Sequence, residues 1–441
     1  TASTGGDASP PAQREDRPGP FRPTGQDDLA PSGTMAKLDA NLAVLRVLEQ
    51  CRADDRWATE DEQRVLARWA GWGAVPQVFD DDADRFTSER TELRALLGTE
   101  DAWAQARRTT LNAHYTSATV VASMWRAAEG LGFDGTGRVL EPGCGSGNFI
   151  GFAPPGASAT GIELDRTTAE IARQLYGGRA TPHPPRFADH RVDDGTYDLV
   201  IGNVPFASVK PHDPVHNRGR HALHNYFLLK SLHLVRPGGL VVALTSRYTL
   251  DARNPAARRE MAAISDLVGA LRLPERAFAA SSGTDVVVDL VVLRRRLPGQ
   301  DPAGPAWSRT VPAAIEGDGP AAGAAERLDI NEYFDAHPDH ILGQLTAGRG
   351  MYREHELTVT TTGVIDEQLP AALNRLVAEA RTRGATLSPR PEPSSATRVP
   401  LATVAEGRFD TSSAQEGSFV TDDHGAIGRF KNGTVLTYTP R

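Results

Sequence analysis

The 441-residue sequence is poor in cysteine and has no long apolar run, and each absence excludes a class of protein. Only Cys51 and Cys144 occur, far apart in the chain, which gives no basis for a disulfide framework or a cysteine-based zinc site. No apolar stretch approaches the roughly 18 residues of a membrane span, and the N-terminus lacks the charged-then-apolar pattern of a signal peptide. We therefore expect a cytoplasmic protein without a membrane partner.

Positive charge is also scarce, because 48 Lys and Arg stand against 56 Asp and Glu, for a net charge of −8. This balance argues against a surface that binds nucleic acid by charge alone and leaves room only for a local basic cleft. The sequence starts at Thr1 instead of Met and ends at Arg441 without a closing pattern. We expect it to be part of a longer protein whose other domains are missing here.

Composition changes along the chain predict its domain organisation. Residues 1–30 are rich in Pro, Gly, Asp and Ser and have few large apolar side chains, as in a disordered tail. Leucines at helical spacing then begin a helical N-terminal domain over 31–111, with a helix cap at Thr59 and a later helix from Thr91 to Thr109. The remaining divisions are a central domain (112–297), a linker (298–325), an appendage with a helix (326–387), and a linker with a short β-like tail (388–441).

The central domain alternates apolar runs with amphipathic stretches, which predicts an α/β, Rossmann-like, doubly wound sheet. A third strand is expected to end at Phe187–Asp189. The expected strands are 138–141, 159–164, 197–201, 240–245, 267–273 and 286–293, and the expected helices are 118–130, 166–176 and 224–235.

A glycine-rich turn follows the first of these strands and organises the domain. After Glu141 and Pro142, glycines stand at alternate positions, at 143, 145 and 147. Glycine permits the backbone to approach a ligand closely and to adopt conformations that other residues avoid. Such a turn by itself fits several nucleotide-like ligands.

Glu163 narrows that choice, because it ends the next strand about 20 residues after the turn, where an acid can accept hydrogen bonds from both ribose hydroxyls. NAD would favour a longer helix facing its pyrophosphate, whereas the helix after this turn is cut short by Pro154 and Pro155. A cofactor without phosphates, S-adenosylmethionine, fits better.

The sequence Asn203-Val204-Pro205-Phe206 ends the fourth expected strand and carries the clearest chemistry. The exocyclic amine of adenine is a poor nucleophile because its lone pair is delocalised into the ring. The Asn203 side-chain carbonyl and the Val204 backbone carbonyl could accept its two hydrogens, while Phe206 stacks on a flipped base. The alternative is an ordinary turn with Asn in a left-handed conformation and Phe in the core.

Taken together these motifs resemble the N6-adenine type of amino-group DNA methyltransferases and the modification subunits of type I restriction systems. The resemblance is strongest to the methylase part of large methylase–helicase fusions of phages and mobile elements, the antirestriction-like group. It implies S-adenosylmethionine as cofactor, DNA as partner with the target adenine flipped out of the duplex, and a helicase region beyond this chain. The segments that match the amino-group methyltransferases are His114 to Thr116, Leu140 to Phe149, Gly161 to Asp165, Asp189, Asn203 to Phe206, and Arg236 to Gly239. Those that resemble type I modification subunits are Leu271 to Pro274, Phe278 and the strand Val286 to Leu293, and those shared with the fusions include 224–227, Thr245 to Tyr248 and Gly348 to Tyr352.

By this resemblance Tyr115 and Thr116 would contact the methionine end of the cofactor, the glycine turn its carboxylate, Glu163 the ribose, and Asp189 the adenine amino group. Two departures stand out: Val204 replaces the usual Pro, and Ser117 replaces the Pro that usually follows Tyr-Thr. Further expected cofactor contacts are Glu141, Pro142, Asn148, Phe149, Leu164 and His190.

A segment with four histidines, at 212, 216, 221 and 224, lies between the Asn203 motif and the next helix. Pro and Gly within it favour a loop over a metal site, and we expect no metal. Basic residues nearby make it a candidate for phosphate or base contacts, with a plain solvated loop as the alternative. The candidate substrate contacts are Lys210, Arg218, Arg220, Asn225 and Tyr226.

The sequence thus predicts methylation of adenine N6 in DNA, in a restriction-modification, defence or antirestriction context. Two other interpretations remain open. A protein methyltransferase acting on a glutamine amide would need the same Asn-x-Pro-aromatic chemistry, and a cofactor-binding module could sense DNA without methylating it. Trp69 and Trp72 are expected to close a small core, with base stacking as the alternative.

Overall fold

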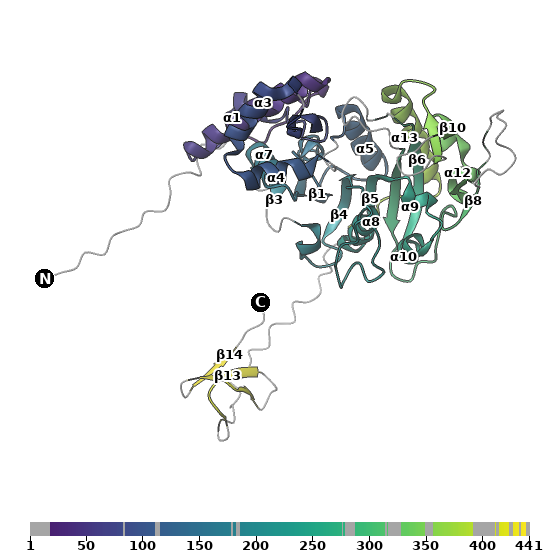
Figure 1. The fold of residues 1–441 in the computed structure, drawn as a ribbon. Helices are drawn as coiled ribbons and strands as arrows, with labels where there is room; N and C mark the ends of the chain where they lie inside the picture. The colour runs from purple at the N-terminus through teal and green to yellow at the C-terminus, as the bar shows by residue number, and fades with distance from the viewer. Residues whose placement is uncertain are drawn as a thin grey trace. The chain divides into compact units, whose positions relative to one another are not determined.

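The computed structural model divides the chain into two compact units, Thr1–Ser388 and Pro389–Arg441, which are described separately (Figure 1). Predictions for the first 17 residues, His114, residues 278–286 and residues 349–352 lie outside the described part. The described residues are 18–82, 84–110, 115–177, 180–181, 186–275, 277, 287–313, 315, 328–348, 356–390, 411, 414–422, 427–431 and 434–437.

The N-terminal region is helical, as expected, although one predicted helix is wrong. The stretch 91–109 forms two helices, because Gly98 adopts a left-handed φ of 70° and Thr99 caps the next helix by accepting a hydrogen bond from the Ala102 N–H. Thr59 caps its helix as predicted. The α-helices are α1 (Thr34–Ala53), α2 (Glu60–Leu66), α3 (Thr87–Leu97) and α4 (Glu100–Thr109), with 3-10 turns η1 (Gln26–Asp28), η2 (Pro76–Phe79) and η3 (Asp84–Phe86).

A seven-stranded sheet in the order β3-β2-β1-β4-β5-β7-β6 forms the centre of the first unit (Figure 1). Strands β3, β2, β1, β4 and β5 run parallel, and β7 is antiparallel to both of its neighbours. This order confirms the predicted Rossmann-like fold. The strands are β1 (Gly137–Pro142), β2 (Ala157–Ile162), β3 (Ala180–Thr181), β4 (Tyr197–Asn203), β5 (Val235–Ser246), β6 (Ser265–Leu273) and β7 (Val288–Arg295).

The third strand is shorter and earlier than predicted. It comprises Ala180–Thr181, whereas Phe187–Asp189, expected to end a strand, forms the 3-10 turn η5 and turns the chain back toward β4. The helices between the strands are α5 (Ala118–Gly130), α6 (Asn148–Gly151), α7 (Arg166–Tyr176), α8 (Leu223–Leu234), α9 (Tyr248–Asp251) and α10 (Ala256–Ile264).

The part of the chain that follows β7 folds back and packs against the sheet and its helices. Helix α13 packs against α5 and β6, and just beyond it the Leu387 N–H donates to the Leu131 carbonyl at 2.8 Å. The Ser388 N–H donates to the Gly238 carbonyl at 2.9 Å. The elements involved are β8 (Thr310–Pro312), β9 (Asp329–Asn331), α12 (Glu332–Ala336), η6 (Pro338–His340), β10 (Gln344–Gly348), β11 (Glu356–Thr360) and α13 (Ile365–Thr382).

The second unit is a small antiparallel sheet. Its strands are β12 (Phe419–Thr421), β13 (Ile427–Lys431) and β14 (Thr434–Thr437), in that order. The turn between β13 and β14, at residues 432–433, lies outside the described residues.

Tryptophans of the N-terminal region belong to the core, as expected. Trp69 and Trp72 are 1% and 3% exposed, and their rings meet edge to face with centroids 5.3 Å apart. The Trp69 indole N–H also donates to the Thr168 hydroxyl at 3.2 Å, which ties the helical region to α7.

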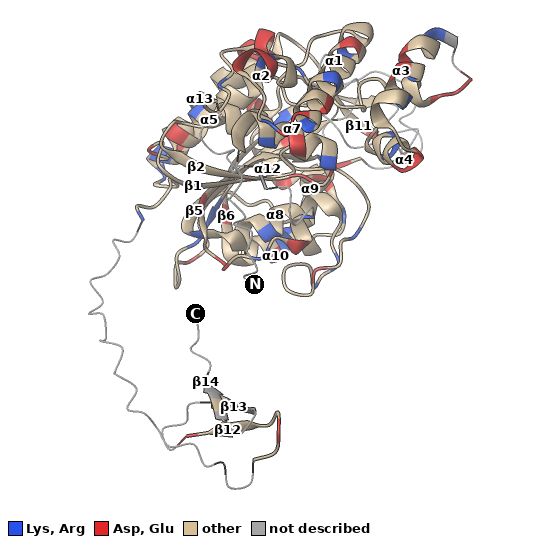
Figure 2. Cartoon of the chain, turned by 90° about the vertical axis from the view of Figure 1, so that its left-hand side faces the viewer, with Lys and Arg blue, Asp and Glu red and all other residues tan. Residues whose placement is uncertain are grey.

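A buried ion cluster lies at the antiparallel end of the sheet. The Arg272 guanidinium contacts Asp289 at 2.8 and 2.9 Å and Asp251 at 2.7 Å, and all three side chains are at most 2% exposed. Charges of both signs otherwise lie on the helices that surround the sheet (Figure 2). No helix within the described residues is both long and apolar enough to span a membrane.

Candidate cofactor and target site

A cavity of about 790 Å³ lies at the carboxyl ends of β1, β2 and β4. The ends of parallel strands meet at one edge of a sheet, which is where α/β folds bind ligands. Predicted residues from all three strand ends meet in this cavity. Those that line it are Tyr115, Thr116, Glu141, Gly143, Gly145, Asn148, Phe149, Glu163, Leu164, Asn203, Val204, Pro205, Phe206 and Tyr226.

The glycine turn requires its glycines for two reasons. Gly143, Gly145 and Gly147 have φ values of 72°, 56° and 89°, a region that side chains disfavour. A Cβ at Gly147 would also lie only 2.6 Å from the Tyr176 ring. Gly147 therefore shapes the turn from behind and does not line the cavity, and the same holds for Pro142.

Glu163 connects the turn to the end of β2. Its carboxylate accepts hydrogen bonds from the Gly145 N–H at 2.9 Å and from the Asp165 N–H at 2.8 Å. Burial raises the pKa of Glu163 to about 7, despite these two N–H donors. The carboxylate thus faces the cavity and is poised to accept hydrogen bonds from hydroxyl groups.

Two buried side-chain oxygen atoms in or beside the cavity have no hydrogen-bond partner among the described residues. They are Oε2 of Glu141 and Oγ of Ser146, which are 4% and 1% exposed as residues. Burial raises the pKa of Glu141 well above its ordinary value. An unpaired buried oxygen costs about 1–3 kcal/mol, so a ligand with a donor at this position would be bound favourably.

Asn203 ends β4 with its side-chain amide fixed in one orientation. Its Nδ2 donates to the Thr116 hydroxyl at 3.3 Å, and the Asn148 Nδ2 donates to the Thr116 backbone carbonyl at 3.2 Å. The Oδ1 of Asn203 is buried and has no hydrogen-bond partner among the described residues. The amide therefore presents a free acceptor to the cavity.

The rest of the Asn203 motif forms one wall of the cavity. Val204 is 2% exposed and its N–H donates to the Leu244 carbonyl at 3.1 Å, so the motif remains part of the sheet. Pro205 lies against Gly143, where an added Cβ would meet its Cδ at 3.4 Å. Phe206 is half-buried and lines the cavity. The glycine turn and the Asn203 motif, both predicted from the sequence, thus form facing walls of the cavity.

Tyr115 covers the turn from the opposite side, where an added Cβ on Gly145 would lie 3.3 Å from its ring. Burial, with Glu163 and Asp165 nearby, raises the pKa of its hydroxyl well above 10. The Tyr115 hydroxyl is therefore a neutral donor in this acidic environment.

Besides Pro142 and Gly147, two further predicted cofactor residues do not line the cavity. Asp189 is exposed, while the preceding Phe187 and Ala188 form that part of the wall. His190 is 8% exposed and pairs through Nε2 with the Tyr197 hydroxyl at 3.0 Å. The 3-10 turn at 187–189 explains this arrangement, because its successive side chains point about 120° apart, so that Phe187 and Ala188 can line the cavity while Asp189 points to solvent.

Of the predicted substrate contacts, only Tyr226 lines the cavity. Its hydroxyl donates to Asp213 at 2.9 Å. Asn225 is buried beside it, with Oδ1 unpaired among the described residues. Lys210, Arg218 and Arg220 are exposed on the loop between β4 and α8, outside the cavity lining.

That loop has a defined internal structure. Asp213 accepts hydrogen bonds from the Val215 and His216 N–H groups, both at 3.0 Å. Asn217 bridges the loop by donating to the Pro211 and His221 carbonyls at 2.8 and 3.2 Å. The His221 ring pairs with Glu260 of α10 at 2.6 Å. The loop is therefore held at both ends.

Sequence reasoning missed a contribution from the N-terminal helices to the cavity. Trp69, Gly71, Gln105, Arg108 and Thr109 line it from α4 and the turn after α2. The sequence Trp69-Ala-Gly-Trp72 was the signal that could have indicated this contribution. Its tryptophans can belong to the core and Trp69 can still line the cavity. Other unpredicted lining residues are Cys144, Ile162, Asp165, Thr168, Arg186, Phe187, Ala188, Ala207, Val209, Pro211, Leu223 and Phe227.

The sheet order, the glycine turn after β1 and the acid after β2 define the fold as that of Rossmann-like S-adenosylmethionine-dependent methyltransferases. No protein-family model and no curated protein matches the sequence.

Solved structures similar to the chain include a protein assigned to the class I S-adenosylmethionine-dependent methyltransferases, from Listeria monocytogenes (15% identity, TM-score 0.36, 60% of this chain and 90% of that one). A type I restriction-modification methyltransferase subunit from Streptococcus thermophilus is 16% identical (TM-score 0.34, 60% and 67%). A protein assigned as a type I modification subunit, from Vibrio vulnificus, is 21% identical (TM-score 0.34, 47% and 50%), so this chain spans half its length. Likenesses this distant carry no argument about activity.

Proposed function

We propose that the chain is an S-adenosylmethionine-dependent DNA methyltransferase that acts on N6 of adenine. The observation that carries the proposal is the orientation of Asn203: its amide nitrogen is bound to Thr116, and its buried Oδ1 is free at the cavity. A free acceptor at this position can take a hydrogen from an amine and help to localise its lone pair.

The chemistry of the cavity fits the cofactor. S-adenosylmethionine carries a positive sulfonium and a positive α-amino group, and the carboxyl groups of Glu141, Glu163 and Asp165 all line the cavity. Glu163 would accept from the ribose hydroxyls, and the unpaired Oε2 of Glu141 would accept from the α-amino group. Phe187 and Ala188 offer an apolar surface to the adenine ring. When bound, the cofactor supplies an electrophilic methyl group.

The residues of the Asn203 motif would hold the target. Asn203 Oδ1 accepts one hydrogen of the amine, the Val204 carbonyl accepts the other, and Phe206 stacks on the base. A base can reach this depth only after it leaves the duplex, so base flipping is part of the proposal. The cofactor would supply the methyl group to this nitrogen, while Asn203 and the Val204 carbonyl hold the amine, and the extra proton of the amine would leave to solvent.

The wider biological role rests on the sequence resemblance alone. We propose that the chain works with a helicase region of a larger protein, in a restriction-modification, phage defence or antirestriction setting. Arg108 and Arg186 at the cavity wall, and Lys210, Arg218 and Arg220 on the exposed loop, are the candidate phosphate contacts.

Transfer of a tritiated methyl group to unmethylated genomic DNA tests the function, in wild type and Asn203→Ala. We expect label in DNA, recovered as N6-methyladenine, and a loss of at least about 100-fold in the variant, as for removal of one polar group that acts in the transition state. Calorimetric titration with S-adenosylmethionine should give similar affinities for both proteins.

Three outcomes contradict the proposal in different ways. Cofactor binding without label in DNA would favour a recognition module. Label in a protein fraction would favour a glutamine methyltransferase. Absence of cofactor binding would overturn the assignment of the cavity itself.

A further inference from the structure

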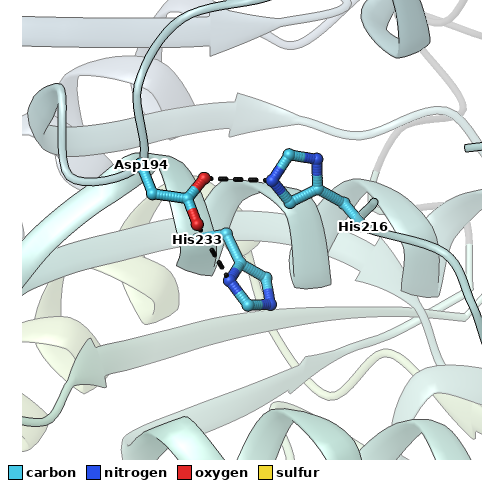
Figure 3. Close-up of side chains that lie close together, drawn as sticks. All are labelled: Asp194, His216 and His233. Carbon is cyan, nitrogen blue, oxygen red and sulfur yellow. Dashed lines mark hydrogen bonds and ion pairs between the residues drawn. The ribbon is translucent and has the colours of Figure 1, made fainter. Parts of the chain in front are cut away.

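Outside the cavity, Asp194, His216 and His233 converge at the surface (Figure 3). Asp194 lies in the turn before β4, His216 in the loop between β4 and α8, and His233 at the end of α8. Figure 3 shows the carboxylate of Asp194 between the two imidazole rings. Three distant segments of the chain thus offer three metal-ligating side chains to one point.

The distances suit a transition metal. Asp194 Oδ1 lies 3.0 Å from Nε2 of His216, and its Oδ2 lies 3.5 Å from Nδ1 of His233. One ligand atom from each of the three residues lies within 4.8 Å of the others. Two ligands of a tetrahedral zinc ion, at bond lengths of about 2.0–2.1 Å, are about 3.3 Å apart. Small side-chain rotations would therefore bring all three donors into the coordination sphere.

The carboxylate of Asp213, on the far side of the His216 ring, is a second, independent observation that supports a metal site. Asp213 Oδ2 lies 3.6 Å from Nδ1 of His216, on the side of the ring away from Asp194. Asp213 is itself fixed by the N–H groups of Val215 and His216 and by the Tyr226 hydroxyl. Metal-binding histidines commonly direct their other ring nitrogen toward such a carboxylate, which sets the tautomer.

The surroundings of the cluster leave access for a metal ion. Two cations lie nearby: Arg295 donates to the carbonyls of His233 and Val235, both at 2.6 Å, and Lys230 pairs with Asp213 at 3.3 Å. The Asp194 side chain is 47% exposed, so an ion can enter from solvent.

We propose that Asp194, His216 and His233 form a binding site for a divalent transition ion of the Zn²⁺ class, with water completing the coordination. Imidazole and carboxylate ligands select such ions. On binding, Nε2 of His216 takes the metal and its ring proton moves to Nδ1, facing Asp213. The ion links the loop before α8 to the turn before β4, and so supports the wall that carries Tyr226. The proposal is independent of the methyltransferase function.

Titration with Co²⁺ tests the site, because Co²⁺ substitutes for Zn²⁺ and gives visible absorption bands that depend on its ligands. The full chain, free of any histidine tag and dialysed against chelator, should bind one equivalent, which one equivalent of Zn²⁺ displaces. His216→Gln and His233→Gln should weaken Co²⁺ binding at least about 100-fold, and Asp213→Asn should weaken it about 10–100-fold.

A matched control lies on the same loop: His221 pairs with Glu260 and not with the cluster, so His221→Gln should bind Co²⁺ as wild type does. Circular dichroism of the metal-free variants checks that each is folded. His337 and His340, whose ring centroids lie 5.5 Å apart, form a separate histidine pair. The proposal is overturned if wild type shows no bound band, if His216→Gln binds equally well, or if only His340→Gln removes binding.

Discussion

The Asn203 amide donates to the Thr116 hydroxyl at 3.3 Å, which joins the end of β4 to the segment before α5. This bond decides which end of the amide faces the cavity. Removing the hydroxyl with Thr116→Val leaves the amide free to rotate. The methyl-transfer rate should fall about tenfold, which corresponds to the 1.4 kcal/mol typical of one hydrogen bond.

Single-turnover methyl transfer measures this effect, with Thr116→Ser as the matched control because it keeps the hydroxyl. Cofactor affinity is measured separately and the cofactor kept saturating, because Thr116 also lines the cavity. Equal rates for the Val and Ser variants would show that the hydroxyl does not orient Asn203.

Glu163 makes cofactor binding depend on pH. Burial raises its pKa to about 7, and only the ionised form accepts hydrogen bonds at both oxygens from the ribose. Affinity for S-adenosylmethionine should therefore fall as pH drops through 7, with roughly tenfold weaker binding at pH 6 than at pH 8. Calorimetry across this range measures it, and Glu163→Gln should bind weakly with little pH dependence below 8.

The same pKa has the opposite effect on stability without cofactor. Because the folded-state pKa lies above the ordinary 4.5, the contribution of Glu163 to stability is complete below 4.5 and is lost as pH rises through about 7. Glu163→Gln should thus raise the cofactor-free unfolding midpoint at pH 8 and leave it nearly unchanged at pH 4.5. A variant less stable than wild type at pH 8 would contradict this sign.

Gly147→Ala should destabilise the fold through both strain and overlap. The φ of 89° costs about 1–3 kcal/mol for a side chain, and the added Cβ meets the Tyr176 ring, at a further cost of about 1–3 kcal/mol. Gly384→Ala is the matched control, because its φ is 68° and nothing lies within 4 Å of an added Cβ. Urea unfolding should show the larger loss at Gly147. Equal losses would mean that Tyr176 moves aside freely.

Arg272→Met should be strongly destabilising, by about 3–5 kcal/mol, because it removes the cation that contacts both buried carboxylates and leaves only Arg247, 3.7 Å from Asp251. Arg309→Met breaks an ion pair with Glu332 in which the Arg309 side chain is 78% exposed, so it should cost at most about 1 kcal/mol. Denaturant midpoints compare the two. A small effect at Arg272 would indicate that the carboxyl groups accept protons at little cost.

Local sequence signals predicted most of the fold and the main walls of the cavity. Strand ends were recognisable because an apolar run stops at Glu141, Glu163 or Asn203, and parallel strands place such ends together. The third strand was misplaced because Ala180–Thr181 is very short and Phe187 resembles a strand residue while packing as part of a 3-10 turn. The break at Gly98 was missed because apolar spacing continues across it.

Contacts between distant segments could not be predicted from local pattern. Nothing near His233 marks it as a neighbour of Asp194 and His216, since the fold alone brings them together. Gln105 and Arg108 reach the cavity because the N-terminal helices pack on α7, a placement that depends on tertiary contacts. Arg294 is 8% exposed because its side chain donates to the Thr386 carbonyl after α13, a contact between segments far apart in the sequence.

Helix α13 has a consequence for how the protein is made. It packs on α5, which follows directly after Thr116, yet it is synthesised more than two hundred residues later. On the ribosome, β1, β2 and β4 can emerge and pair while the outer face of α5 still lacks its partner. The first unit can acquire its full set of native contacts only after residue 388 has left the exit tunnel.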